Sequence, residues 1–419
     1  MLLKAEIAHW LDRIEKIIES DIRYILHGGF WLSVGKVIAA LASLALAVAF
    51  ANLLSKELFG NYKYILSLAA LVGAFSLSGL GTALTRAVAR GYDGELDRSM
   101  HRAFWWSIPA SILALIASGY YALNENSTLA LSLILIALLN PITNATSLFQ
   151  PFLLGKKEFR ARSVLSSLQA SVPALFVIAS LYVTHSVVIL ASIMLVCTMI
   201  VSALSTYYAR RRYVHNNRLD SEASKLTFHA SILSFLGAIA GRADAILIFQ
   251  NLGATPLAVY AFATAIPDSL RGSAKVFTSL ATPKFAQHHP DVLKRTLKKK
   301  EAYTGLALLL TAITYIAVAP WIFKTFFPLY MDSLVYSQVY ALTVIFTLPL
   351  ASAYFDAQLA IKERYAAGIF GATTQLGFVL IGLVFGGLWG VIFGRVAARA
   401  ALALFVSLLI RYHTKPHTL

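Results

Sequence analysis

Long apolar segments separated by short polar loops recur along nearly the whole chain. A helix of about 20 residues crosses the hydrocarbon core of a bilayer, so segments of this length are typical of transmembrane helices. The pattern predicts an all-α, polytopic membrane protein with about twelve spans. These are placed near 29–54, 62–84, 102–123, 129–154, 163–184, 187–209, 229–250, 256–282, 302–324, 336–360, 366–385 and 388–410.

The first 26 residues follow a different pattern. Acidic and basic residues are mixed there without a continuous apolar core, which argues against a cleavable signal. Isoleucines and a leucine recur at helical spacing, so we predict an amphipathic helix on the cytoplasmic membrane surface over residues 1–26.

Charge adds an orientation to this picture. The chain is 58% hydrophobic and 13% charged, with a formal net charge of +16, and its lysines and arginines gather in alternate loops. By the positive-inside rule these loops are cytoplasmic, so both termini are expected inside and the number of spans is even. A nucleic-acid partner is not expected, because basic residues that bind nucleic acid cluster on one soluble face.

The chain also reads as two similar halves. At an offset of 198 residues, Phe59-Gly60-Asn61-Tyr62 meets Leu257-Ala258-Val259-Tyr260, and Arg86 meets Lys284. Six spans separate the two positions, so the halves are parallel repeats, as in transporters with a central pathway. We expect two six-helix lobes at 27–209 and 229–410, a basic cytoplasmic linker at 210–228 and a cytoplasmic tail at 411–419.

Prolines fall within several predicted spans. Proline removes a backbone donor and interrupts the helical hydrogen-bond ladder, so each is expected to mark a hinge or exposed carbonyls. The positions are Pro109, Pro141, Pro173, Pro267 and Pro349.

Ionisable residues inside the spans are informative because they are costly in hydrocarbon and normally face a cavity or a partner. In the eighth span Thr264, Asp268, Arg271 and Lys275 form one polar stripe. Asp268 either neutralises Arg271, one turn away, or joins it in lining a cavity. Lys275 has no acid on its own helix.

The first, seventh and last predicted spans also carry charged residues. Lys36 lies deep in the first span, either in a cavity or with its stem reaching the cytoplasmic surface. Arg242 and Asp244 lie on nearly opposite faces of the seventh span; Arg242 is the cavity candidate, whereas Asp244 pairs with a neighbouring helix or serves as a proton or sodium site. Arg395 and Arg399 share a face of the last span, either in the cavity or capping carbonyls.

Basic residues therefore outnumber acidic residues within the bilayer, and a cationic central cavity requires an anion. The planar fork of arginine and the mobile charge of lysine both suit a diphosphate. No catalytic residue, cofactor or metal site is predicted, and the single Cys197 excludes an intrachain disulfide. The candidate diphosphate ligands are Lys36, Arg242, Arg271, Lys275, Arg395 and Arg399; Asp244 and Asp268 are candidates for ion coupling or charge pairing.

Several short motifs resemble those of a known family. These are Leu58-Phe59-Gly60-Asn61-Tyr62, Ser78-Gly79-Leu80-Gly81 followed by Arg86, and Arg242-x-Asp244 with Gly253 and Tyr260. Across about residues 28–410 the chain resembles the polysaccharide transporters, the Wzx-type O-antigen flippases of the multidrug/oligosaccharidyl-lipid/polysaccharide exporter superfamily.

The resemblance implies two six-helix lobes in a V around a cationic cavity, in the inner membrane of a bacterium. It implies outward translocation of an undecaprenyl-diphosphate-linked repeat unit for O-antigen, capsule or exopolysaccharide synthesis, with a glycan polymerase and a chain-length regulator as partners besides membrane lipid. An ion-coupled drug exporter of the same superfamily and a membrane glycan polymerase or ligase are the alternatives. Exporters of drugs use acidic sites for cationic substrates, and an enzyme would need larger extracytoplasmic loops.

The charge pattern makes a direct topological prediction. A cysteine introduced at position 126, in a short loop without basic residues, should react with a membrane-impermeant thiol reagent added from outside. Labelling of position 126 only from the inside would contradict the predicted orientation.

Overall fold

The computed structural model describes residues 22–74, 79–220, 223–274, 278, 281, 285, 290–358 and 360–412. Every element assigned within these ranges is an α-helix or a short 3₁₀ helix, which confirms the all-α prediction for the described residues. The predicted surface helix at 1–26 falls mainly outside them, and so do Lys275 and residues 413–419.

The helices are those of a multi-pass membrane protein. Among the described residues, eight helices are long and apolar enough to cross a membrane, or nine if one bent pair counts as a span. The last of them is α16 (Ile361–Tyr412), whose 52 residues hold two antiparallel helices, because the ring of Phe370 stacks on that of Phe405 with the centroids 4.1 Å apart. The chain turns back at Gly387, between the predicted spans 366–385 and 388–410; φ is +53° there, and glycine takes this conformation without the clash of a side chain.

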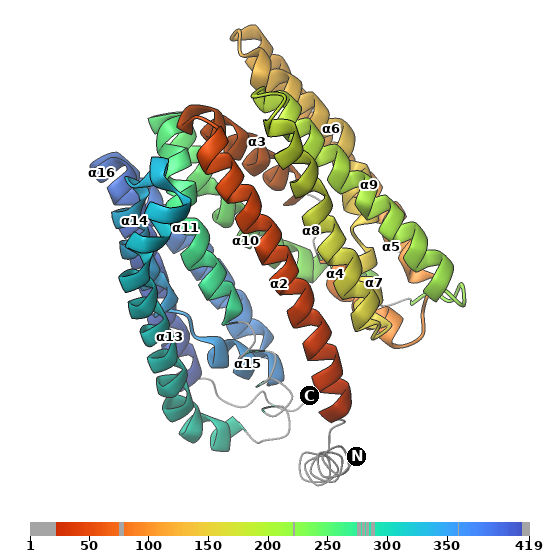
Figure 1. Ribbon diagram of the computed structural model, residues 1–419. Helices are drawn as coiled ribbons and strands as arrows, with labels where there is room; N and C mark the ends of the chain where they lie inside the picture. The colour runs from red at the N-terminus through yellow and green to blue at the C-terminus, as the bar shows by residue number, and fades with distance from the viewer. Residues whose placement is uncertain are drawn as a thin grey trace, which may run out of the picture.

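The helices from the first part of the chain pack mainly with one another, and we call them the N bundle. Helix α5 packs along α6, α2 along α8, and α9 against both α6 and α8. Most of this bundle lies on the right of Figure 1. Its members are α2 (Ile22–Leu53), α3 (Lys56–Ala74), α4 (Leu80–Ala89), α5 (Glu95–Leu123), α6 (Ser127–Thr146), α7 (Phe149–Gly155), α8 (Phe159–Leu181) and α9 (Val187–Tyr213).

The remaining helices form the C bundle, on the left of Figure 1. Helix α10 packs along α16, and α11 packs against α14. The members are α10 (Ala223–Leu252), α11 (Ala254–Ser273), α13 (Pro290–Phe326), η1 (Pro328–Tyr330), α14 (Ser333–Tyr340), η2 (Ala341–Val344), α15 (Pro349–Ala357) and α16.

The expected tenth span is broken rather than continuous. The segments Ser333–Val344 and Pro349–Phe355 meet at an angle of 41°. Pro349 opens α15, where its missing N–H costs no helical hydrogen bond. The other four predicted prolines lie inside α5, α6, α8 and α11 without ending them, so of these five Pro349 alone stands at a helix break.

Two buried acids fix the segment that leaves the N bundle. Asp93 is fully buried and accepts hydrogen bonds from Lys156 Nζ at 2.6 Å and from the backbone N–H of His215 at 2.9 Å. Glu95, also buried, accepts from the backbone N–H of Asp220 at 3.4 Å. The connection as far as Asp220 is therefore attached to the N bundle, inside the stretch predicted as a linker.

The two bundles meet where α3 packs against α11 and α10. Helix α3 starts at residue 56 and α11 at residue 254, so the offset of 198 seen in the sequence carries one helix start onto the other. A Cβ atom at Gly60 would overlap the carbonyl oxygen of Ala254. The close approach of these two helices therefore requires glycine at position 60.

Aromatic rings and one ion pair extend this contact. The Phe59 ring lies 4.9 Å from that of Phe262 and 6.1 Å from that of Tyr330, centroid to centroid. Lys56 Nζ lies 2.5 Å from Asp332 Oδ2. Together with the Gly60–Ala254 contact, these interactions close one end of the space between the bundles, and we call them the gate.

Replacing Gly60 with leucine should separate α3 from α11, because the new side chain would occupy the position of the Ala254 carbonyl. The measurement is the yield of thiol crosslinking between cysteines introduced at positions 56 and 332 in a Cys197→Ser background. The bifunctional reagent should be short enough to join these cysteines only while α3 and α11 are in contact. We expect a severalfold loss of yield. The control is Gly119→Leu, where a Cβ would meet no neighbour within 4 Å; equal yields in both variants would contradict the role of Gly60.

Candidate functional site

The strongest concentration of buried charge begins at Asp244 on α10. This side chain is 5% exposed, and its Oδ2 accepts a hydrogen bond from the hydroxyl of Tyr260 on α11. Arg395 Nε on α16 lies 3.5 Å from the same oxygen, and the Arg395 side chain is 6% exposed. The pair holds three helices together, because either charge alone would be costly in this environment.

The contacts continue from Arg395 toward a second acid. Arg395 Nη2 donates to the Tyr340 hydroxyl at 2.8 Å, and that hydroxyl donates to Asp268 Oδ1 at 3.1 Å. Asp268 also pairs with Arg271 at 3.0 Å. The polar stripe of α11 is thus joined to α14 and α16 by a connected set of charges and tyrosine hydroxyls.

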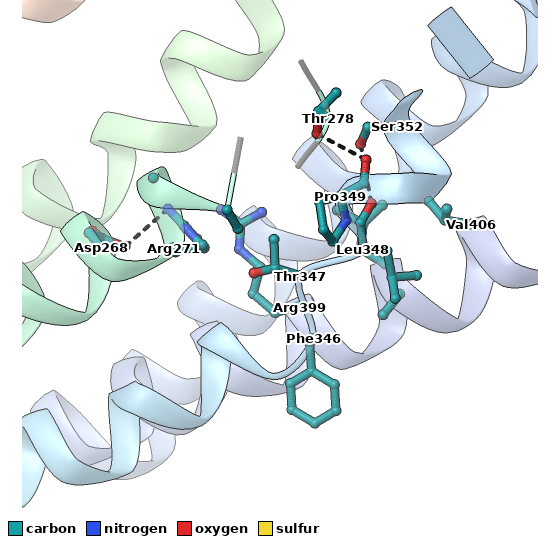
Figure 2. A pocket seen from close by; sticks show the side chains of 14 residues that line it. Asp268, Arg271, Thr278, Phe346, Thr347, Leu348, Pro349, Ser352, Arg399 and Val406 are labelled. Carbon is teal, nitrogen blue, oxygen red and sulfur yellow. Dashed lines mark hydrogen bonds and ion pairs between the residues drawn. The ribbon is translucent and has the colours of Figure 1, made fainter. Parts of the chain in front are cut away.

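A cavity of about 490 Å³ lies at the end of this network, and we call it the C cavity. Its described lining comes from α11, the bend before α15, α15 itself and α16, all in the C bundle. In Figure 2 Arg271 and Arg399 extend toward each other from α11 and α16. The Nη1 atom of Arg271 is buried without a hydrogen-bond partner, so this arginine of the cavity lining has one donor that the protein does not satisfy.

A second cavity of about 420 Å³ lies between α3, α6, α9 and α10, and we call it the interbundle cavity. Lys63 of α3 and Arg242 of α10 line it, along with the amides of Asn140 and Asn144. No aspartate or glutamate is among its described lining residues. Its charge is therefore positive on the sides contributed by both bundles.

The structure separates residues that the sequence analysis grouped in one central cavity. Arg242 lines the interbundle cavity, whereas Arg271 and Arg399 line the C cavity. Arg395 is buried against Asp244, and Lys36 is exposed on α2 and lines neither cavity. The described lining of the Arg271 cavity comes from the C bundle, and the placement of Arg271 between the lobes stays a prediction.

The separation follows from α10 itself. Arg242 and Asp244 are two residues apart and therefore point to different sides of the helix, as expected from helical geometry. One side faces α3, α6 and α9 and carries Arg242; the other faces α11 and α16 and carries Asp244. A single helix thus serves two different polar environments.

Sequence reasoning missed four residues of these environments. Tyr340 reads as an apolar residue of a helix, and Tyr260 was named only as part of the internal repeat and of a family motif, although the hydroxyls of both connect the buried charges. Lys63 lay at the edge of a predicted span, where a lysine is ordinary, and Asn140 is an uncharged residue within a span. Helical spacing offered one signal, because Tyr260 precedes Thr264 by one turn and so belongs to the same stripe.

Comparison with known proteins identifies the family of this chain. The sequence matches the family described as "Polysaccharide biosynthesis protein" over residues 25–289, more than half of the chain. The chain belongs to the polysaccharide biosynthesis protein family. The resemblance inferred from the motifs is therefore confirmed at the level of the family. Comparison with curated proteins gives no match.

Solved structures show the fold. An inward-facing multidrug resistance MATE family transporter of the MOP superfamily superposes with a TM-score of 0.66 at 16% identity, covering 89% of this chain and 94% of its own. The lipid II flippase MurJ, in an inward closed conformation, gives 0.64 at 14% identity, covering 91% and 87%. A MOP superfamily transporter from Pyrococcus furiosus, whose title reports a binding pocket of reversed polarity, gives 0.59 at 17% identity, covering 92% and 94%. The polysaccharide biosynthesis protein therefore has the fold of MOP superfamily transporters.

The buried pair should behave as a unit. Asp244→Ala or Arg395→Ala alone leaves an unpaired buried charge, and each is expected to lower the free energy of unfolding by about 3 to 5 kcal/mol. The Asp244→Ala/Arg395→Ala variant should lose much less than the sum of the two. Unfolding in detergent measures this, with Lys56→Ala as the exposed-pair comparison, expected near or below about 1 kcal/mol. Additive losses would show that the two side chains do not interact.

Proposed function

We propose that this polysaccharide biosynthesis protein is a flippase for a polyprenyl-diphosphate-linked oligosaccharide, which moves the repeat unit from the cytoplasmic to the periplasmic leaflet of a bacterial inner membrane. The observation that carries the proposal is the C cavity, where two arginines from different helices face one space and one has an unpartnered buried nitrogen. Membership of the polysaccharide biosynthesis protein family supports this choice of substrate.

The C cavity has the chemistry of a diphosphate site. Arg271 uses one nitrogen on Asp268 and keeps Nη1 available, while Arg399 has no acid within 4 Å among the described side chains. Guanidinium groups from two helices can bind different oxygens of a diphosphate, each in a bidentate fashion. The hydroxyls of Thr347 and Ser352 line the same space and add neutral donors. A polyprenyl chain attached to this group would remain in the surrounding lipid.

The alternatives fit these cavities less well. A drug exporter for cations needs an accessible acid, but Asp244 is buried beneath Tyr260 and Arg395, and Asp268 is paired with Arg271. A glycan polymerase or ligase needs reactive groups at an aqueous face, and the connections expected there, such as Asn124 to Asn126, are only a few residues long. An ion bound at either aspartate would first have to displace an arginine.

We further propose that the gate is the extracytoplasmic closure of a cytoplasm-facing state of a twelve-span, two-lobe transporter. The gate joins the bundles at the end marked by Lys56 and Asp332, in loops that carry almost no other basic residue. Rocking of the bundles would open the gate and expose the bound diphosphate to the other leaflet. Membrane potential or an ion gradient would supply direction.

Deletion of the gene in its glycan-producing host should cause complete lipid-linked repeat units to accumulate on the cytoplasmic side. Arg399→Met should fail to restore export despite normal protein abundance, because it removes the cavity arginine that has no described acidic partner. Arg271→Lys should restore export in part, since the charge survives without the planar fork. Lipid extraction and analysis of surface glycan measure both.

The matched control is Arg211→Met, an exposed arginine of α9 that stacks over Tyr207 and lines neither cavity. It removes the same charge and should restore export fully. Full export by the Arg271→Ala/Arg399→Met variant, or the absence of accumulated lipid-linked units in the deletion strain, would refute the proposed function.

A further inference from the structure

A further pocket, of about 520 Å³, lies in the N bundle where α8 begins and α9 ends, and we call it the α8–α9 pocket. It shares no described lining residue with the C cavity or the interbundle cavity. Its wall has a charged part, an apolar part and two tyrosines. In that order these are Glu158 and Arg160; Ala161, Val164 and Leu165; and Tyr208 and Tyr213.

The two parts of the wall lie at different depths along α8. Glu158 directly precedes the helix and Arg160 is its second residue, whereas Val164 is four residues further on. At 1.5 Å per residue the apolar part begins about 6 Å deeper along the helix axis than the arginine. The pocket is therefore shaped for a ligand that is charged at one end and apolar at the other.

The charged part lies at the level expected for a membrane surface. On α9 the exposed Tyr207 and Tyr208 are followed by the basic run Arg210–Arg212. Aromatic residues followed by basic residues are typical of the cytoplasmic boundary of a span. Trp31 of α2 lies at the same level, because the Arg160 guanidinium carbon is 5.1 Å from the centre of its ring. A lipid of that leaflet can enter the pocket head group first.

Glu158 and Arg160 offer two opposite charges to one space. No ion pair joins them to each other or to another described side chain, whereas Lys156 and Arg210 nearby are each paired with an aspartate. Glu158 stands at the N-cap of α8, yet its side chain makes no capping bond. Arg160 lies over the face of the Trp31 ring, an arrangement that leaves its N–H groups available to an acceptor.

This pair of charges favours a zwitterion over a simple ion. Glu158 would repel a ligand that carries only a negative charge, and Arg160 would repel one that carries only a positive charge. The rings of Tyr208 and Tyr213, with centroids 6.3 Å apart at 73°, add aromatic surface that attracts a cation. A head group with one phosphate and one ammonium matches both charges.

We propose that the α8–α9 pocket binds a phospholipid with an amine head group, of the phosphatidylethanolamine class. The phosphate accepts hydrogen bonds from Arg160, the ammonium donates to Glu158, and the acyl chains lie along Val164 and Leu165. This lipid belongs to the surrounding leaflet and is not the cargo, so the inference stands independently of the proposed function. The bound lipid would join the start of α8 to the end of α9.

The experiment measures lipid binding to the full chain in detergent micelles by native mass spectrometry. The probes are dioleoyl phosphatidylethanolamine, dioleoyl phosphatidylglycerol and soluble phosphoethanolamine. The two lipids share a phosphodiester and acyl chains, but only the first carries an ammonium group. The unaltered protein should bind phosphatidylethanolamine at least fivefold more tightly than phosphatidylglycerol. Phosphoethanolamine should not compete, because it lacks chains for the apolar part of the pocket.

Two variants separate the two charges. Glu158→Gln should weaken phosphatidylethanolamine at least fivefold and leave phosphatidylglycerol unchanged or tighter, so that the preference disappears. Retained binding of phosphatidylglycerol also shows that this variant is folded. Arg160→Gln should weaken both lipids severalfold, because both lose the partner of their phosphate. Arg160→Lys keeps the charge and should restore part of the binding, which a loss of folding would not allow.

Matched controls remove the same charges elsewhere in the N bundle. Glu125→Gln neutralises an exposed acid in the short connection between α5 and α6. Arg211→Met removes an exposed arginine of α9 that does not line the pocket. Each should change the affinity for both lipids less than twofold.

Four results would overturn the assignment. The unaltered protein could bind phosphatidylglycerol as tightly as phosphatidylethanolamine, which would indicate a general anion site. Glu158→Gln could retain the preference, or Arg160→Gln could bind both lipids within twofold of the unaltered protein. Effective competition by soluble phosphoethanolamine would show that the pocket binds a free head group and not a lipid.

Discussion

Burial of charge in helices surrounded by lipid is the constraint on which this structure depends. The carboxylate of Asp244 and the guanidinium of Arg395 compensate each other's charge, and the Tyr260 hydroxyl donates a hydrogen bond to the carboxylate. Their contact joins α10 to α16 and α11, which fixes the rotation of α10 about its own axis. That rotation in turn decides which cavity receives Arg242. A structural ion pair therefore positions a residue with which it has no contact.

Some of the buried charges are paired with acids of the protein, whereas others face open space. Arg395 lies within a network of two acids and two tyrosines that joins α10, α11, α14 and α16. Arg399, one turn further along α16, lines the C cavity with no acid beside it. Neighbouring arginines on one helix face thus differ in their surroundings, because the facing helices present Asp244 to one and open space to the other.

Much of the fold is accessible from the sequence because a bilayer imposes a length and an apolar character on each span. The repeat offset also holds locally, since Lys56 and Ala254 begin corresponding helices. Other features depend on tertiary contacts. The predicted tenth span, for example, is bent by 41° between Ser333–Val344 and Pro349–Phe355.

The candidate site was predictable in its residue types and only partly in its grouping. Excess positive charge within the spans indicated an anion, whereas the division between Arg242 and Arg271 depends on helix orientation, which spacing along one helix does not determine. Lys63 was overlooked because a lysine near a span boundary is ordinarily attributed to the interface. The buried Nδ2 of Asn140, a donor without a partner, becomes visible only when its neighbours Asn144 and Ser107 are in place.

The attachment of the connecting segment at Asp93 and Glu95 has a consequence for assembly. Because the chain is held to the N bundle as far as Asp220 and α10 begins at Ala223, only a few residues tether the two halves. Three residues span at most about 10 Å when fully extended. Such a short tether gives each C bundle a very high effective concentration near its own N bundle. Exchange of halves between neighbouring copies of the chain is thereby disfavoured, even at moments when the gate is open.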